Sequence, residues 1–119
     1  MARRSRAVLT PIQLLLCGQI RAALKGRGTI REVQMFGGLS FLIDGKMIVA
    51  AQKNGDLLVR IDPKKSSDLL CRPDTRQAEM GKGRLMGPSW LVAEGPLTAA
   101  EVRFWTDVAM ESRALDVPG

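Results

Sequence analysis

The residues best suited to bind a charged ligand form a short glycine-rich segment, Gly81-Lys82-Gly83-Arg84. Its backbone amides and its two cations could together surround an anion. The segment lacks the GxxxxGK[ST] and GxGxxG spacings that mark nucleotide-binding loops, and a flexible turn is the structural alternative. We therefore keep Lys82 and Arg84 as candidate anion-binding residues and assign no nucleotide to them.

Arginines near the start of the chain form a second candidate anion site. Arg3, Arg4 and Arg6 precede the first expected helix, and each guanidinium can donate two parallel hydrogen bonds to a phosphate. Seven of the 18 Lys and Arg residues lie in the first 31 positions, which hold none of the 12 acids, and the net charge is +6. This asymmetry favours an anionic partner such as a nucleic acid, with a solubilising tail as the alternative.

The side chains offer little for catalysis. The 119 residues include no histidine, which excludes His-dependent triads, His metal sites and imidazole switches. Cys17 and Cys71 are too few to complete a metal site, and we expect two buried, free thiols and no disulfide. Asp44 and Arg60 are interpreted as a turn residue and a paired strand residue. The sequence predicts no catalytic residue, no metal and no cofactor, so we do not expect an enzyme.

The elements that would position these residues begin with a helix. Thr10-Pro11 predicts an N-cap followed by proline in the first turn, and Gly26 should end the helix. Residues 1–9 are expected to form a flexible basic arm and residues 10–119 a single domain. The expected buried stripe of the helix consists of Ile12, Leu15, Leu16, Ile20 and Leu24.

A series of strands joined by tight turns should follow. The expected strands are Ile30 to Phe36, Leu39 to Ile43, Lys46 to Gln52 and Leu57 to Asp62. Between them, the Asp-Gly and Asn-Gly pairs predict two-residue type I′ turns and therefore an antiparallel meander. Two-residue turns fix the register, so Phe41 should face Ile48, and Val49 should face Arg60.

This register predicts a sheet with two apolar faces. The face expected under the helices carries Leu39, Phe41, Ile43, Ile48, Ala50, Leu57, Val59 and Ile61. The opposite face is too apolar to lie fully in water, and its candidate interface residues are Leu42, Met47, Val49, Leu58 and Arg60. Either a helix of the same chain or a second subunit would cover this face, so we expect a homodimer as one outcome.

The second half of the chain predicts fewer strands. A short helix from Lys64 to Leu70 should lead into a turn-rich loop over residues 74–89. A strand from Trp90 to Ala93 should precede a capping box, Thr98-Ala-Ala-Glu101, which starts a helix ending near Leu115. The predicted fold class is α+β, with an antiparallel β-meander packed against N- and C-terminal α-helices in the order α-β-β-β-β-α-β-α.

A long run in the strand region resembles the signature of a known family. The run reads Met35-Phe36-Gly37-Gly38-Leu39-Ser40-Phe41-Leu42-Ile43-Asp44-Gly45-Lys46-Met47, and collinear matches follow at Leu58-Val59-Arg60, Leu70, Arg72-Pro73, Met80, Gly83-Arg84, Met86-Gly87 and Trp90. Over residues 30–92 the sequence resembles the N-terminal domain of the TfoX/Sxy family. The spacing between Gly87 and Trp90 departs from the commoner form, in which the glycine and the aromatic residue are adjacent.

The resemblance implies an α+β domain of a family best known for regulating natural competence genes together with another transcription factor. Full-length members carry a second, C-terminal helical domain, so the chain resembles a stand-alone N-terminal domain. We therefore expect a non-enzymatic regulatory or adaptor domain that contacts a protein partner, such as a transcription regulator.

Two alternative functions stay open at this point. The first is a nucleic-acid-binding accessory protein that uses the basic arm, and the second is a sensor of a small anionic ligand that uses the glycine-rich segment. No apolar run approaches the roughly 18 residues of a membrane span, so we expect a cytoplasmic protein without membrane contact.

Overall fold

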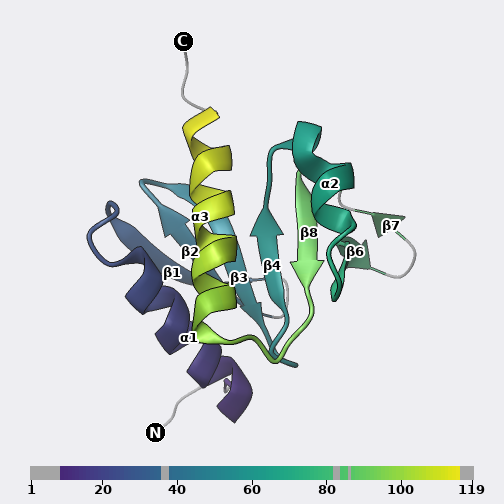
Figure 1. Cartoon of the computed structure of the whole chain (residues 1–119). Helices are drawn as coiled ribbons and strands as arrows, with labels where there is room; N and C mark the ends of the chain where they lie inside the picture. The colour runs from purple at the N-terminus through teal and green to yellow at the C-terminus, as the bar shows by residue number, and fades with distance from the viewer. Residues whose placement is uncertain (1–8, 36–37, 82–83, 86, 116–119) are drawn as a thin grey trace, which may run out of the picture.

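The computed structural model describes residues 9–35, 38–81, 84–85 and 87–115 of the chain. The elements, in chain order, are α1 (Pro11–Leu24), β1 (Ile30–Met35), β2 (Gly38–Ile43), β3 (Lys46–Gln52), β4 (Leu57–Arg60), the 3-10 turn η1 (Pro63–Lys65), α2 (Ser66–Leu70), β5 (Thr75–Gln77), β6 (Glu79–Gly81), β7 (Arg84–Leu85), β8 (Trp90–Ala93) and α3 (Ala99–Leu115). Figure 1 shows α1 and α3 lying side by side in front of one sheet. The predicted α+β class, with a helix near each end, is confirmed.

The main sheet is antiparallel and has six strands in the order β1-β2-β3-β4-β8-β5. Strands β6 and β7 form a separate two-stranded sheet at the far side from α1 (Figure 1). The predicted loop over residues 74–89 therefore contains three short strands, which the sequence did not indicate because glycines and Pro88 favoured a loop. Strand β5 extends the sheet because Thr75 and Gln77 pair with Ala93 and Leu91 of β8.

Helix α1 starts at the predicted cap. The Thr10 hydroxyl oxygen accepts from the Gln13 amide at 3.2 Å, and the Gln13 side-chain oxygen accepts from the Thr10 amide at 3.1 Å. This reciprocal pair is a capping box, and proline occupies the first turn. The Thr10 hydroxyl also donates to the Lys53 carbonyl oxygen at 2.7 Å, which fixes the start of α1 against the β3–β4 turn.

The first hairpin of the meander has the predicted turn, and the second does not. Ile43 pairs with Lys46 across a two-residue turn in which Asp44 and Gly45 both have positive φ, as a type I′ turn requires. In the second hairpin Ala51 pairs with Leu57, which leaves a three-residue loop over 53–55. Positive φ at its last residue is typical of three-residue hairpins, so the prediction of a two-residue Asn-Gly turn is wrong by one position.

A β-bulge in β3 shifts the register further. Phe41 pairs with Val49 while Leu42 pairs with Met47, so Ile48 is the extra residue on β3. The predicted pairing of Phe41 with Ile48 is therefore wrong. The predicted pairing of Val49 with Arg60 is wrong for a different reason: the three-residue loop before β4 pairs Val49 with Val59. After the bulge the alternation of side chains is inverted, which places Val49 under the helices and Ala50 on the opposite face.

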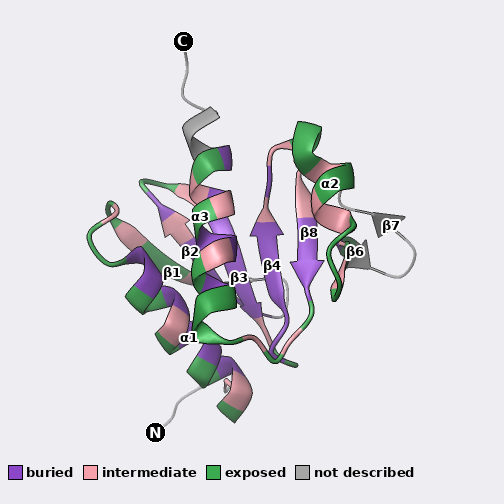
Figure 2. Cartoon of the chain, viewed as in Figure 1, coloured by how far each residue is buried: buried purple, intermediate pink, exposed green. Residues whose placement is uncertain are grey.

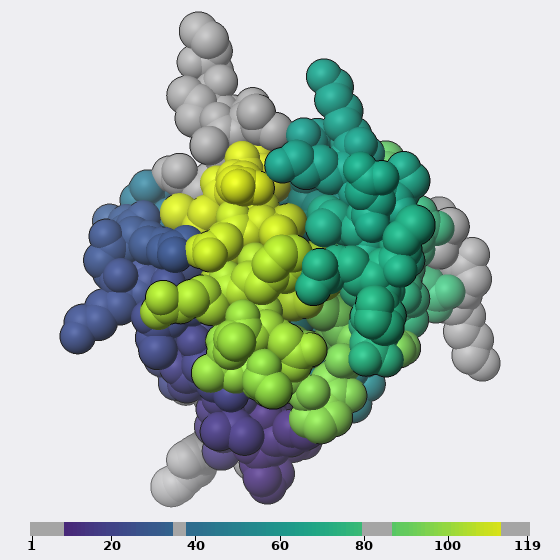
Figure 3. Space-filling model, in the orientation of Figure 1, coloured from purple at the N-terminus to yellow at the C-terminus, as the bar shows by residue number. Residues whose placement is uncertain are grey.

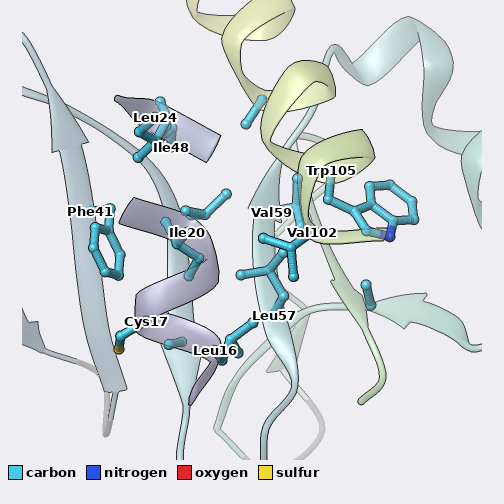
Figure 4. Packing of buried hydrophobic residues seen from close by; sticks show 14 of the residues in the cluster. Leu16, Cys17, Ile20, Leu24, Phe41, Ile48, Leu57, Val59, Val102 and Trp105 are labelled. Atoms are coloured by element: carbon cyan, nitrogen blue, oxygen red, sulfur yellow. The ribbon is translucent and has the colours of Figure 1, made fainter. Parts of the chain in front are cut away.

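The main core lies between the sheet and the two long helices. Figure 4 shows Ile20 and Leu24 of α1 beside Phe41 and Ile48, while Val102 of α3 meets Val59. Strands β3, β4 and β8 are largely buried, and the exposed residues of α1 and α3 lie away from the sheet (Figure 2). The predicted capping box of α3 is present, since Thr98 and Glu101 exchange side-chain to backbone hydrogen bonds at 2.8 and 3.1 Å.

Helix α3 occupies the centre of the helical layer and is tied to its neighbours on both sides (Figure 3). Arg27, beyond the end of α1, forms a 2.6 Å ion pair with Asp107. On the other side Lys65 contacts Glu111 at 3.3 Å, and the Arg72 guanidinium lies 4.2 Å from the centre of the Phe104 ring. These contacts hold α3 between the α1–β1 connection and α2.

A buried carboxylate joins three segments at one end of the sheet. Asp56 accepts hydrogen bonds from the Gly95 amide at 2.8 Å and from the Asn54 side chain at 3.0 Å. Arg76 of β5 contacts Asp56 at 3.3 Å and Glu94 at 3.0 Å. The β3–β4 turn, β5 and the end of β8 are thereby fixed relative to one another.

Candidate interaction surfaces

The side of α1 that points away from the sheet carries two exposed leucines. Leu14 is 53% exposed and Leu15 is 64% exposed, whereas Leu16, Ile20 and Leu24 of the same helix are buried. The prediction that Leu15 belongs to the buried stripe is therefore wrong. Its place is taken by Gln13, which is only 1% exposed.

Gln13 is buried because both ends of its amide group have partners. Its side-chain oxygen completes the capping box, and its Nε2 donates to the Ala51 carbonyl oxygen of β3 at 2.8 Å. Successive helical residues are rotated by roughly 100°, so three consecutive leucines cannot share one buried face. With Gln13, Leu16 and Cys17 directed inward, Leu14 and Leu15 must lie toward solvent.

The exposed strip continues along the helix past the two leucines. Pro11, Leu14, Leu15, Gly18 and Ala22 are all exposed and follow one another at helical spacing; we call these five residues the outer face of α1. A Cβ placed on Gly18 would meet no atom within 4 Å, so packing within the described fold does not require a glycine there.

Basic side chains lie at both ends of this outer face. Lys53 is exposed beside the start of α1, and Lys25 is exposed at its C-terminal cap. Arg21 donates from Nε and Nη2 to both oxygens of Glu32 on β1, at 2.7 and 2.8 Å. This hydrogen-bonded pair lowers the pKa of the Glu32 carboxyl and raises that of the Arg21 guanidinium.

Two carboxylates close to α1 are thus already engaged, Glu32 with Arg21 and Asp107 with Arg27. Lys25 and Lys53 add positive charge at the two ends of an apolar strip. The outer face can therefore offer a partner apolar contact and positive charge together.

The second sheet face, opposite the helices, is where the sequence predicted an interface. A continuous row of cross-strand neighbours runs over it through Ser40, Ala50, Leu58, Val92 and Arg76. Leu58 is only 2% exposed because it packs in a small cluster with Ala50, Val92 and Ala78. The segment that follows β5 thus covers part of this face, where the sequence predicted either a helix of the same chain or a second subunit.

The five predicted interface residues separate into two groups. Val49 is fully buried in the core under the helices, so its assignment to the second face is wrong, and Leu58 is covered. Leu42, Met47 and Arg60 do lie on the second face and are partly exposed. They stay predicted interface residues.

The predicted anion-binding residues fall largely outside the part that the structure describes. Arg3, Arg4 and Arg6 lie in residues 1–8, and Lys82 is likewise outside the described residues. Arg84 belongs to β7, but its side chain is not among those described. These assignments, and the division into residues 1–9 and 10–119, therefore stay predictions.

The two thiols differ in their surroundings. Cys17 is buried against the core, where desolvation raises its pKa, and the neighbouring Arg21 opposes this shift only in part. Cys71 is exposed at the end of α2, so the prediction that both thiols are buried is wrong for this one. Within the described residues, no three His, Cys, Asp or Glu side chains gather as a metal site would require.

Residues 22–112 match the model of the TfoX N-terminal domain. The chain belongs to the TfoX N-terminal domain family. No curated protein matches the sequence. None of the described helices combines the length and apolar character that a membrane crossing needs.

The family match places the outer face of α1 mostly outside the matched region. In this TfoX N-terminal domain the run from Leu39 to Met47 forms most of β2, the type I′ turn and the start of β3. These residues therefore build the first hairpin of the sheet. Leu14, Leu15 and Gly18 precede residue 22, where the match begins. The resemblance could not have indicated this surface; the only signal in the sequence was the run of three leucines after Gln13.

Proposed function

We propose that this TfoX N-terminal domain is a non-enzymatic regulatory adaptor that acts by protein–protein contact in transcriptional control of the competence type. Membership of the family supports a regulatory role. The observation that carries the contact mechanism is the pair of leucines on α1, exposed at 53% and 64%. Exposed apolar residues on an ordered helix are typical of protein-binding surfaces.

The outer face is well suited to binding because the opposite side of α1 is firmly fixed. Its start is bonded to Lys53, Gln13 is bonded to Ala51, and Ile20 and Leu24 are fully buried. A surface that is already ordered loses little conformational entropy when a partner binds. The leucines can therefore contribute their full apolar area to an interface.

Site-directed photo-cross-linking tests this function. A benzophenone amino acid at Ala22, on the outer face, should capture a protein that mass spectrometry identifies as part of the transcription machinery or a transcription regulator. The same probe at Ala100, an exposed position on α3, is the matched control. Replacement of both Leu14 and Leu15 by serine should abolish the product. Equal capture at Ala22 and Ala100, or capture that does not need the leucines, would contradict the proposal.

A second candidate function is that of a nucleic-acid-binding accessory protein. The observation that favours it is the seven cations and no acids within residues 1–31. If Arg3, Arg4 and Arg6 contact phosphates, removal of residues 1–9 should make the negative slope of log K against log salt shallower by about 3 for duplex DNA. Unchanged affinity and slope after this truncation would exclude the arm as the contact.

A further inference from the structure

We propose that the outer face of α1 receives an acidic amphipathic helix of a partner protein. The apolar side of that helix would cover Leu14 and Leu15, and its carboxylates would lie against Lys25 and Lys53. This inference rests on the proposed function, since it specifies the chemistry of the partner that the same surface contacts.

The apolar part of the contact follows from the two leucines. They are adjacent residues of a helix that is fixed against the core, with Pro11 before them and Gly18 and Ala22 after them on the same face. This strip is narrow and runs along the axis of α1, so its shape matches another rod-like element better than a broad flat surface. An amphipathic helix presents apolar residues at every third or fourth position and can cover such a strip along its length.

Gly18 supports a helix as the occupant. It lies in the middle of α1 with open space around it, although glycine lowers helix stability relative to alanine. The absence of a Cβ leaves the backbone of α1 accessible, which allows the axis of a second helix to approach closely. Binding to a lipid surface would not require a missing Cβ at Gly18.

The charges decide between an acidic partner and a second copy of this chain. Glu32 and Asp107 are paired with Arg21 and Arg27, so Lys25 and Lys53 leave both ends of the strip positive. Two copies joined through their α1 helices would bring these cations together. Carboxylates on a partner helix would neutralise them and speed association by electrostatic steering.

Three synthetic peptides of about 20 residues test the inference, since shorter helices are marginal in water. They share one leucine and alanine face and carry glutamate, glutamine or lysine at the remaining positions. In fluorescence anisotropy with the full chain, the glutamate peptide should bind at least about tenfold more tightly than the glutamine peptide. The lysine peptide should not bind, and added salt should weaken the glutamate complex. Equal binding of all three peptides would overturn the inference.

Variants assign the binding to the outer face. Replacement of Leu14 and Leu15 by serine should weaken the glutamate peptide by about tenfold or more, as expected for central apolar contacts. Gly18→Gln should weaken it similarly while thermal stability stays the same or rises, because the site is open and glutamine favours helix. Ala100→Gln on α3 is the matched control and should change neither quantity. A Gly18→Gln variant that binds normally would contradict the close approach.

The charge contribution has its own control. Replacement of both Lys25 and Lys53 by glutamine should weaken the glutamate peptide several-fold, whereas replacement of both Lys64 and Lys65 on η1, which removes the same charge, should not. Equal effects of the two changes would show that net charge alone drives binding, which overturns the assignment to this face.

Three further outcomes separate failure of this inference from failure of the proposed function. Leucine-dependent binding to vesicles of anionic lipid, without peptide binding, would assign the face to a membrane and overturn the inference. Self-association that is lost in the serine variant would assign it to a second copy, with the same consequence. If the peptides fail but cross-linking from Ala22 persists, the acidic helix is wrong and protein contact remains; if both fail, the proposed function is wrong as well.

Discussion

Gln13 and Ser40 show how differently two buried polar side chains can be accommodated in one small domain. Both are almost fully buried. Gln13 donates to Ala51 and accepts from Thr10, while the Ser40 hydroxyl has no hydrogen-bond partner in the part of the chain that the structure describes. A buried polar group without a partner loses its hydrogen bonds to water and gains none in the protein. Replacement by alanine should therefore change the free energy of unfolding in opposite directions at the two positions.

We predict that Gln13→Ala lowers the free energy of unfolding by about 1–3 kcal/mol, because the buried Ala51 carbonyl loses its donor and the capping box is broken. Urea denaturation measures the change. Gln19→Ala, at a partly exposed position of the same helix, is the control and should shift stability by less than about 0.5 kcal/mol. A loss at position 13 no larger than at position 19 would contradict this account.

Ser40→Ala should have the opposite sign. Removal of the buried, unpartnered hydroxyl should raise the free energy of unfolding by about 1 kcal/mol, since the methyl group of alanine needs no hydrogen bond. The same urea experiment reports the change. A destabilisation instead would show that the hydroxyl has a partner in the folded protein.

The Arg21–Glu32 pair predicts a pH dependence. The pKa of Glu32 is lowered in the folded chain, so the pair contributes stability above the ordinary value of 4.5, and this contribution is lost as pH falls through the lowered pKa. Both side chains are partly exposed, at 47% and 31%, which limits the effect to about 1 kcal/mol. The stability difference between wild type and Glu32→Gln should be constant near neutral pH and shrink below 4.5. A difference that grows on acidification would exclude the pair as its cause.

At the scale of elements, the sequence correctly predicted the first hairpin turn and the start of α3, whereas the second hairpin turn and the register of β3 were predicted wrongly. The type I′ turn at Asp44-Gly45 and the Thr98 capping box are confirmed because each depends on a few adjacent residues. The bulge at Ile48 lets two adjacent apolar residues, Ile48 and Val49, both lie under the helices. Alternation alone cannot predict this, because the decision depends on the helices above the sheet.

The exposed position of Leu15 on α1 could not be predicted from the sequence either, because it also depends on a long-range contact. Periodicity allowed either Leu15 or Gln13 to complete the buried stripe, and hydrophobicity favoured the leucine. The carbonyl oxygen of Ala51, which lies far along the chain, accepts a buried hydrogen bond from the Gln13 side chain, which a leucine could not donate. A long-range hydrogen bond thus determined which face of the helix became the surface.

Close packing between turns gives a prediction at this scale. A Cβ at Gly95 would collide with the carbonyl oxygen and carbon of Gly55, which belong to the backbone and cannot move aside easily. Gly95→Ala should therefore lower the free energy of unfolding by about 2 kcal/mol or more. Gly45→Ala is the matched control. Its φ is positive but a Cβ there would meet no atom within 4 Å, so only the strain of a positive φ, about 1 kcal/mol, should lower the free energy of unfolding. Equal losses would show that the contact between the turns is not tight.

At the scale of the whole molecule, the sheet separates two surfaces of different character. The outer face of α1 lies on the helical side, with positive charge at its ends. On the opposite side, Leu42, Met47 and Arg60 remain partly exposed after the segment following β5 has covered Leu58. A homodimer through the second face would thus leave α1 free for another protein, so self-association and partner binding are compatible on one small domain.

The homodimer predicted from the sequence can now be tested at one residue. Met47 pairs with Leu42 at the centre of the exposed part of the second face, and Arg31 and Arg60 lie on the same face. Across a twofold contact, Met47→Lys would place a new cation among these arginines and their symmetry equivalents, so light scattering should show a dimeric wild type and a monomeric variant. Leu14→Lys makes the same change on α1 and should leave the dimer intact. A wild type that is monomeric at every concentration, or a dimer that tolerates Met47→Lys, would remove the second face as the interface, because an uncompensated charge cannot be buried there without loss of association.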